Sequence, residues 1–531
     1  MIVNLRREYT YKSIVCLLIA FYFLVLMHIY LPNRGGSGLD LPLNIFAWGW
    51  ICVLMCIICF GNDWHHIFYP HSIIHMIFGV LLLSIPLLWD SKAGLINAGS
   101  RIVALWGCLC VYFILYQLKL CFAQKIMVMW GIFGGIVIET IVALWQIGQL
   151  LIGGGDHPGG IFQQSNVLAT FLATGLAISF VLHQVNKSLW GKIILALSQI
   201  IISMVLVLLF SRIGWLAGTL IYVLYLWRSV TKQHYINTAL LYPVLGMGIG
   251  IGIMSLDSSL LVDKEASTHL RWLLLSATWS MIKANPLSGI GYGEYAYTLL
   301  RNLPVPQAKE AWQVTHPHNE VLYWWVEGGL LAITGIGYIV FSVMRQIITL
   351  KWRENFIWLY VMLPIMLHTM TEFPLGLSMP HLFILLIFIS FFRGKGSSSM
   401  IMKNGSALLV RISSGFCFLL LVPVFIYMSQ ANFYLYLFER NGMNNEDYLA
   451  HIDFPILQWE RYQFDRNVSM LLSYNTTRDE KTLIEFERWA NDYSYRHNDK
   501  NICLTRVKIA KHFRLEEKSS VLKRECDALY P

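Results

Sequence analysis

The sequence predicts an all-α membrane protein that crosses a bilayer many times. Of its 531 residues, 56% are hydrophobic and 13% are charged. A soluble globular protein has about 25% charged residues, so this chain cannot cover a water-facing surface of its size. Two further patterns support the prediction: apolar runs recur along most of the chain, and basic residues gather between them. The composition excludes a cytosolic enzyme, a coiled coil and a disordered chain.

The apolar runs are long enough for membrane helices, which need about 20 residues. They predict about thirteen spans, near residues 14–31, 43–60, 72–89, 102–121, 126–152, 167–182, 190–210, 213–227, 239–254, 328–344, 356–372, 376–392 and 407–428. The first run follows basic residues, as in a signal peptide, but it is too long and lacks a small-residue cleavage site. We therefore predict an uncleaved anchor.

The orientation follows from the enrichment of Lys and Arg in short cytoplasmic loops. With the N-terminus inside, most inside segments carry cations: Arg6, Arg7, Lys12, Lys119, Lys125, Lys187, Lys192, Arg228, Lys232, Arg345, Lys351, Arg353, Arg393, Lys395 and Lys403. The short outside loops hold Arg34, Lys92, Arg101 and Arg212. The N-terminus is therefore predicted to be cytoplasmic and the C-terminus to lie outside.

Two outside segments are long and divide the chain. Residues 1–430 form the predicted transmembrane domain, with an outside loop at about 255–319 between the ninth and tenth spans. Residues 431–531 hold 15 Lys and Arg and 16 Asp and Glu with helical apolar spacing, which predicts a small helical outside domain. Cys503 and Cys526 both lie in this tail, and the sequence leaves their pairing open.

The outside loop ends in His316-Pro317-His318-Asn319-Glu320, with Glu327 further along the expected helix. Histidine exchanges protons near neutral pH, so a titratable cluster where the chain re-enters the membrane favours catalysis. The alternative is a helix cap with Asn319 at its start. A metal site is disfavoured because no third ligand is in register with the two histidines.

Two arginines are candidates for binding an anion at the outer face. Arg212, in Ser211-Arg212-Ile213-Gly214-Trp215, interrupts a long apolar stretch, where a charge is costly and often functional. Arg271 lies on the amphipathic stretch of the outside loop. A guanidinium binds phosphate oxygens in pairs. The alternatives are a topological marker that reaches the interface for Arg212 and a solvated helix face for Arg271.

Two more segments carry polar side chains at the outer ends of spans. A glycine-rich loop precedes Gln163, Gln164 and Asn166, whose amides either bond across helices or hold sugar hydroxyls. Glu372 ends a later span and is expected to pair with an arginine, with or without a functional role.

The net charge of +9 does not indicate nucleic-acid binding, because no dense Lys/Arg block is present. No paired Cys-x-x-Cys with zinc-ligand spacing exists. The glycines of Gly289-Ile290-Gly291-Tyr292-Gly293 lack the strand and helix of a dinucleotide site. We therefore predict neither a metal nor a cofactor.

These motifs in this order resemble the O-antigen ligase and polymerase superfamily. The carrying residues are S-R-I-G-W at 211–215, H-P-H-N-E at 316–320 and the E-G-G that follows at 327–329. Within it the chain looks most like the bacterial protein O-oligosaccharyltransferases, or pilin glycosylation ligases, through G-G-I-F-Q-Q-S-N-V-L-A at 159–169, H-T-M-T-E-F-P-L at 368–375 and the helical tail. Q-Q-S-N stands where that branch is expected to have Q-P-N.

The resemblance implies a multi-pass enzyme of the bacterial inner membrane with its site facing the periplasm. A glycan on undecaprenyl diphosphate would be transferred as a block to Ser or Thr of a pilin or another exported protein. Arg212 and Arg271 would stabilise the diphosphate without a metal, and His318 would be the base.

The remaining candidates would support these groups. Glu320 and Glu327 would orient the His318 region, and Glu372 would hold an arginine. Further substrate contacts are expected from His316, Asn319, Gln163, Gln164 and Asn166. Membrane lipids are expected partners, and nucleic acid is not.

Three other functions remain open at this stage. An O-antigen ligase acting on lipid A core and an O-antigen polymerase would use the same arginines and histidine with a different acceptor. A transporter of lipid-linked glycans is a different class, but such proteins usually show inverted repeats, and none is visible here. The helical tail favours a protein acceptor, because it would provide a folded docking surface.

Overall fold

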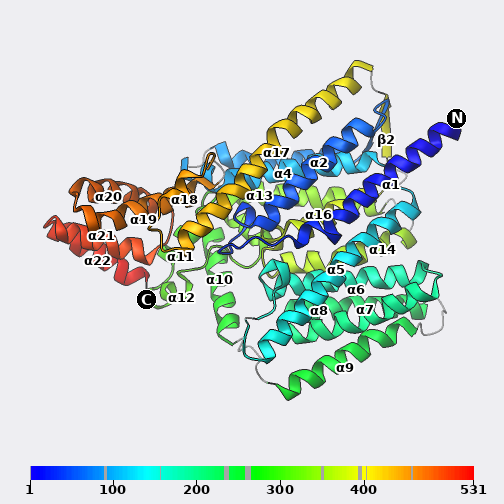
Figure 1. Ribbon diagram of the computed structural model, residues 1–531, viewed down its shortest axis with the longest axis horizontal. Coiled ribbons are helices and arrows are strands. Elements are labelled where there is room, and N and C mark those ends of the chain that lie inside the picture. The colour runs from blue at the N-terminus through cyan, green and yellow to red at the C-terminus, as the bar shows by residue number, and fades with distance from the viewer. Residues whose placement is uncertain are drawn as a thin grey trace.

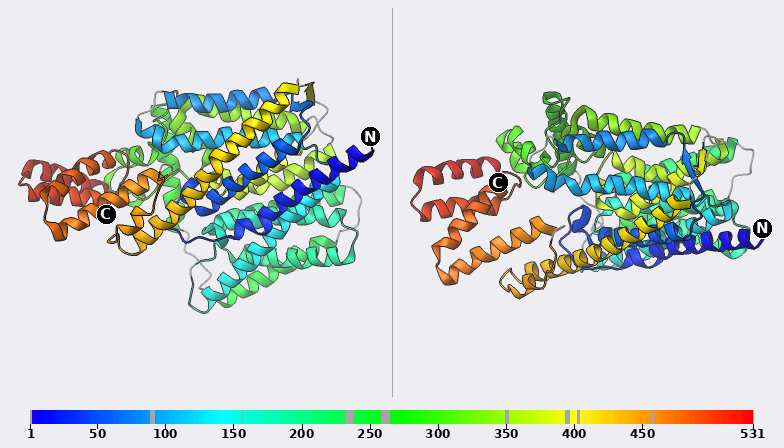
Figure 2. Two further views of the ribbon diagram at one scale, coloured as in Figure 1. Left: turned by 45° about the horizontal axis from the view of Figure 1, so that its top comes forward. Right: turned by 90° about the horizontal axis from the view of Figure 1, so that it is seen from above.

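The computed structural model describes residues 2–88, 92–155, 157–231, 238–257, 265–348, 352–392, 397–401, 404–455 and 458–530. Long helices lie roughly along one direction and form a bundle, and a group of shorter helices projects from one end (Figure 1). The N-terminus lies toward the opposite end (Figure 2). We call the end that carries the C-terminal helices the tail end.

Each predicted apolar run contains a helix. These helices are α1 (Ile2–Leu24), α2 (Pro42–Gly61), α3 (Ile73–Ser84), α4 (Lys92–Gln117), α5 (Phe122–Leu151), α6 (Ser165–Val185), α7 (Leu189–Leu208), α8 (Arg212–Thr231), α9 (Leu241–Leu256), α13 (Glu320–Ile348), α14 (Trp352–Thr369), α16 (Met379–Ser390) and α17 (Asn404–Arg440). The chain is therefore an all-α polytopic membrane protein.

Among the described residues, eight helical segments are long and apolar enough to cross a membrane, and four shorter apolar helices accompany them. The count of about thirteen spans and the orientation stay predictions. Several of the cations that predicted the orientation lie outside the described residues: Lys232, Lys351, Arg393, Lys395 and Lys403.

The core of the bundle is built around α6, which is buried along most of its length. Its sequence contains three Ala, two Thr, two Ser and one Gly, and small residues let neighbouring helices approach closely. The helices α5, α7, α8 and α14 pack around it. The residues just before α6 include both candidate glutamines, Gln163 and Gln164, and they therefore lie at the tail end of the bundle.

The outside loop folds as helices rather than as an irregular segment. Its helices are α10 (Glu265–Ala284), α11 (Tyr295–Asn302) and α12 (Val305–Ala311), and a short α15 (Pro374–Leu377) lies between α14 and α16. Short 3-10 turns join other elements: η1 (Leu26–His28), η2 (Gly38–Asp40), η3 (Ile85–Leu88), η4 (Gly160–Phe162) and η5 (Thr238–Leu240).

The tail is helical, as the sequence predicts. It contains α18 (Asp447–Ala450), α19 (Trp459–Thr477), α20 (Glu480–Ser494), α21 (Lys500–His512) and α22 (Glu516–Leu529). The expected boundary at 430/431 falls inside α17, which continues to Arg440 because Leu435 and Phe438 pack with residues of the tail.

The last two tail helices are joined covalently and packed onto the outside loop. Cys503 and Cys526 form a disulfide between α21 and α22, which settles the pairing that the sequence left open. Val507 and Leu522 share one buried apolar cluster with α10, α11 and α12. Tyr530 packs edge-on against Trp312, with ring centroids 6.0 Å apart. The tail therefore supports the helix that carries Arg271.

Two small strands lie at the end of the bundle opposite the tail. β1 (His66–Pro70) pairs antiparallel with β2 (Ser397–Ile401), with His66 opposite Ile401. They join the segment between α2 and α3 to the segment between α16 and α17. This minor element does not alter the helical class.

Candidate active site

A histidine, a carboxylate and an arginine meet at the tail end of the bundle. The Glu372 carboxylate accepts a hydrogen bond from His318 Nδ1 at 2.9 Å and one from Arg271 Nη2 at 2.9 Å, both through Oε1. The Glu372 side chain is buried, whereas His318 and Arg271 are partly exposed. The predicted pairing of Glu372 with an arginine is confirmed.

The local sequence places Glu372 just beyond the end of α14. Its backbone N–H bonds the His368 carbonyl at 2.9 Å, which closes the last turn. Pro374 then begins the short helix α15, since proline is well tolerated in a first helical turn. The carboxylate is thereby held in a tight turn between two helices.

His318 lies in the loop just before α13 and has a left-handed backbone conformation, with φ of +52°. Histidine tolerates this region better than most residues, and such outliers cluster at functional sites. The next residue, Asn319, caps α13: its side-chain oxygen accepts from Leu322 N at 3.0 Å, and its amide donates to the Met370 carbonyl at 2.9 Å. Asn319 thus has the capping role that the sequence offered as the alternative.

The hydrogen bond to Glu372 fixes the chemistry of His318. A carboxylate accepts only, so Nδ1 carries the proton, and the lone pair of a neutral ring is on Nε2. A carboxylate behind the ring orients it and stabilises the imidazolium that forms when Nε2 takes a proton. The arrangement is suited to a general base.

The charge on Glu372 is stabilised by its neighbours. Burial by itself would raise its pKa, but the hydrogen bond from His318 and the charges of His318 and Arg271 outweigh burial and lower the pKa to about 2. The group therefore stays ionised throughout the physiological range.

His316 packs between His318 and Phe373. Its ring lies 4.7 Å from the His318 ring and 5.6 Å from the Phe373 ring, between centroids. Burial, together with the charge of His318, lowers the pKa of His316 to about 4. Its Nε2 is buried without a partner among the described residues. His316 is thus a neutral packing partner of His318.

The second arginine is joined to the same group through α10. Arg212 Nη1 donates to Thr268 Oγ1 at 2.7 Å, and Thr268 precedes Arg271 by about one helical turn. Arg212 begins α8, and the preceding Ser211 donates to Asn166 Oδ1 at 2.8 Å. One chain of contacts thus runs from the start of α6 to the arginine–carboxylate–histidine group.

The two glutamines of the glycine-rich segment are exposed at this end. Gln163 has φ of +58°, and its amide donates to Asn33 Oδ1 at 3.2 Å. Gln164 immediately precedes α6 and is exposed. Through Asn166 they belong to the neighbourhood of Arg212, although no hydrogen bond joins them to His318 in the described part of the chain.

The two acidic residues of α13 lie elsewhere than expected. Glu327 is fully buried, forms an ion pair with Arg101, and accepts from the backbone N–H groups of Gly293 at 3.0 Å and Tyr295 at 3.4 Å. Glu320 is also buried, and its Oε2 has no partner among the described residues. The carboxylate that orients His318 is therefore that of Glu372, which lies in the turn between α14 and α15.

The reason lies in a break within α13. Gly329 has φ of +62°, and a Cβ there would lie 2.2 Å from the Leu287 carbonyl oxygen. The loop after α10 packs into this break, with Leu330 N donating to the Leu287 carbonyl at 3.0 Å. Glu327 faces that loop, so its carboxylate is occupied by protein donors.

Arg101, which the sequence predicts only as a cation of a short outside loop, packs beside aromatic rings of α13. Its guanidinium lies 4.5 Å from the Trp324 ring centroid and 4.6 Å from that of Tyr323, beside the Glu327 carboxylate. The sequence does contain a signal for a functional or structural role of Arg101, because this arginine belongs to an apolar helix of membrane-spanning length, where a charge is costly. It joins α4 to α13 next to the candidate site.

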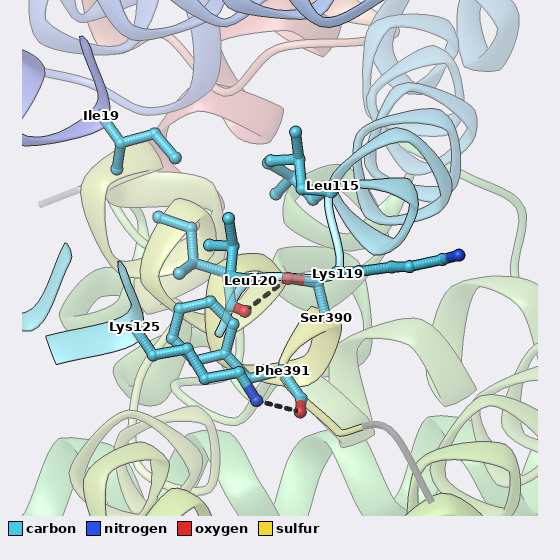
Figure 3. A pocket seen from close by; sticks show the side chains of 9 residues that line it. Ile19, Leu115, Lys119, Leu120, Lys125, Ser390 and Phe391 are labelled. Atoms are coloured by element: carbon cyan, nitrogen blue, oxygen red, sulfur yellow. Dashed lines mark hydrogen bonds between the residues drawn. The ribbon is translucent and has the colours of Figure 1, made fainter. Parts of the chain in front are cut away.

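Figure 3 shows a small pocket lined by residues near the end of α4, the start of α5 and the end of α16, and none of the candidate site residues lines it. Lys125 folds back to donate to the Phe391 carbonyl at 3.0 Å, and Lys119 extends away from the pocket. Among the described residues, no group of three or more His, Cys, Asp or Glu side chains could hold a metal ion.

The fold and the site together define a multi-pass membrane protein with a histidine–carboxylate–arginine group at one end of a helix bundle. The chain matches the O-Antigen ligase family over residues 197–337. It matches the C-terminal family of the virulence factor membrane-bound polymerases over residues 356–496. It also matches the protein glycosylation ligase family over residues 158–183. The resemblance to the O-antigen ligase superfamily, and to its protein glycosylation ligases, is confirmed.

The matched segments contain the candidate residues. Arg212, Arg271 and His318 fall in the O-Antigen ligase segment, Gln163 falls in the protein glycosylation ligase segment, and Glu372 falls in the polymerase segment. An O-antigen ligase of Salmonella typhimurium (strain LT2) is 25% identical over 183 residues, covering 30% of this chain. The alignment covers 41% of that relative's length. These matches are similarities to glycan ligases and polymerases over parts of the chain.

Proposed function

We propose that this protein transfers a preassembled glycan from undecaprenyl diphosphate to Ser or Thr of a pilin or another exported protein, on the periplasmic face of the bacterial inner membrane. The observation that carries the proposal is the group His318–Glu372–Arg271, with Arg212 joined to it through α10. A base and two cations at one end of a helix bundle suit an acceptor hydroxyl and a lipid diphosphate.

The arginines would act on the leaving group. When the bond between the anomeric carbon and the phosphate oxygen breaks, negative charge develops on the diphosphate. Fixed guanidinium groups stabilise that charge most when they are oriented before the reaction. Glu372 holds Arg271 in place, and Thr268 accepts from Arg212, so both side chains are preorganised. In this proposal they replace a divalent cation.

His318 would act on the acceptor. The hydroxyl oxygen attacks the anomeric carbon, and its proton passes to Nε2 of His318. The resulting imidazolium is stabilised by the Glu372 carboxylate on Nδ1. A general base at this position contributes typically about 10²–10⁴-fold to the rate.

A protein acceptor is supported by the match of residues 158–183 to the protein glycosylation ligases. A second candidate is an O-antigen ligase acting on lipid A core, which is supported by the match over residues 197–337 and by the Salmonella typhimurium relative. Both reactions use the same donor chemistry, and they differ in the acceptor.

The test is co-expression with a lipid-linked glycan pathway and a candidate pilin, followed by intact-mass analysis of the pilin. We expect a glycan-sized mass gain with the wild type and its loss in His318→Ala. His451→Ala is the matched control, since that histidine lies in the tail, where its ring bonds the Asp447 carbonyl at 2.6 Å and stacks on Tyr434.

Three outcomes would contradict the proposal. A mass gain that persists in a stably expressed His318→Ala would show that this residue is not the base. An unmodified pilin together with lipopolysaccharide that carries the polymer would favour the O-antigen ligase instead. Lipid-linked glycan trapped inside the cell when the protein is absent would indicate transport.

A further inference from the structure

Glu139 is a carboxylate inside a membrane helix that the mechanism above does not use. It lies on α5, is 1% exposed, and is surrounded in sequence by apolar residues. An ionisable residue inside a membrane helix is costly and is retained where it has a function. The two oxygens of this carboxylate contact different segments of the chain.

One oxygen of Glu139 is engaged by a histidine. Oε1 lies 2.7 Å from His28 Nδ1, and His28 Nε2 lies 2.9 Å from the Phe23 carbonyl oxygen. Oxygen acceptors therefore lie at both ring nitrogens, and the ring is held from both sides. The pair joins α5 to the turn that follows α1.

The other oxygen of Glu139 holds the backbone of the glycine-rich segment. Oε2 accepts from Ile161 N at 3.0 Å. Two helical turns further along α5, Gln146 Oε1 accepts from Gly159 N at 3.1 Å and from Gly160 N at 2.8 Å. Two side chains on one face of α5 thus hold three consecutive N–H groups.

The contact with the carboxylate explains why residue 160 is glycine. Its φ is +58°, and a Cβ there would lie 2.5 Å from Glu139 Oε2. A side chain at this position would therefore separate the segment from the carboxylate. The turn is shaped to approach Glu139 closely.

The held turn leads directly to the exposed glutamines. Gln163 and Gln164 follow it at the tail end of the bundle, and Asn166 then bonds Ser211, which is next to Arg212. A shift of the turn would therefore move the glutamines relative to Arg212.

We propose that Glu139, with His28 and Gln146, is a positioning residue that fixes the turn at residues 159–164 for binding the glycan of the donor. The inference rests on the proposed function. Amide groups bond sugar hydroxyls, and their affinity depends on how well they are preorganised. Hydrogen bonds to an ionised carboxylate are about twice as strong as neutral ones, so Glu139 should matter more than Gln146.

The experiment uses the full-length protein in lipid nanodiscs with a lipid-linked glycan and a pilin acceptor. Glu139→Ala should raise the KM for the donor about tenfold, which corresponds to about 1.4 kcal/mol, with kcat changed less than about twofold. Hydrogen exchange at residues 159–161 should become faster in the same variant, because their N–H groups lose an acceptor.

Two further variants make the result specific. Glu139→Gln keeps an oxygen for Ile161 N and offers an N–H to a neutral His28, so it should restore most of the donor affinity. Gln149→Ala, on the same helix beyond Gln146, is the matched control and should leave both the KM and the exchange unchanged.

The outcomes separate the inference from the function on which it rests. Faster exchange in Glu139→Ala with an unchanged KM would overturn the positioning role while leaving glycan transfer intact. A raised KM without faster exchange would show that Glu139 does not act through the turn. Absence of transfer by the wild type to any acceptor would overturn the proposed function and the inference with it.

Discussion

Replacing Glu372 by glutamine removes the charge that His318 and Arg271 share while keeping the shape of the side chain. The carboxylate accepts from both residues at 2.9 Å. A hydrogen bond to a charged group contributes about 1.5–3 kcal/mol. If the bond from His318 is fully used in the transition state, its loss lowers the transfer rate about 10- to 160-fold.

The assay is the initial rate of glycan transfer to an acceptor protein, followed by intact mass and compared with the melting temperature of each variant. Glu310→Gln is the matched control: its carboxylate lies 3.6 Å from His269 on the same outside loop, but both groups are mostly exposed. We expect the control to keep the wild-type rate, since exposed pairs contribute little.

The pH dependence of stability gives a second measurement on the same variant. The folded pKa of Glu372 is about 2, below its ordinary value of 4.5. Its contribution to stability is therefore fully present above pH 4.5 and is lost as the pH falls toward 2. Glu372→Gln should lack this loss. A wild-type rate in Glu372→Gln, or an equal loss of rate in Glu310→Gln, would refute the role of this carboxylate.

Three other changes test the surroundings of the site. The pKa of His316 falls from 6.5 to about 4 on folding, so the folded state should lose stability as the pH drops from 6.5 to 4, and His316→Phe should flatten the melting temperature over that window. Arg101→Leu leaves the Glu327 charge buried without its partner and should lower the free energy of unfolding by about 3–5 kcal/mol, measured by denaturant unfolding. The decrease should be smaller in the double variant that also carries Glu327→Gln. Cys526→Ser opens a loop with a sequence separation of 23 to Cys503 and should destabilise the tail by about 3 kcal/mol, measured as faster proteolysis of the tail.

The sequence was sufficient for the helices because their signal is local. A run of apolar residues identifies a membrane helix without reference to any other part of the chain. The same holds for the tail, where the apolar spacing of 482–493 and 502–513 predicts helices that the structure contains as α20 and α21. The domain boundary at 430/431 stays a prediction, since the residues on both sides of it belong to one helix, α17.

The sequence also identified the residue types at the site. Glu372 ends an apolar run, His318 lies where the outside loop returns to the membrane, and Arg271 lies on the amphipathic stretch of that loop. Their chemistry follows from their side chains, and their shared location follows from the alternation of the spans. The sequence does not show which of these side chains contact one another.

The sequence by itself determined the class of this protein, its helices and the candidate groups at one end of them. Only the tertiary structure decided that Glu372, 54 residues from His318, orients that ring, and that Glu327 is occupied by Arg101, 226 residues away. A membrane helix is determined by residues that are adjacent in the chain. These two contacts depend instead on which helices pack together and how each is rotated about its axis, and no local sequence pattern specifies that.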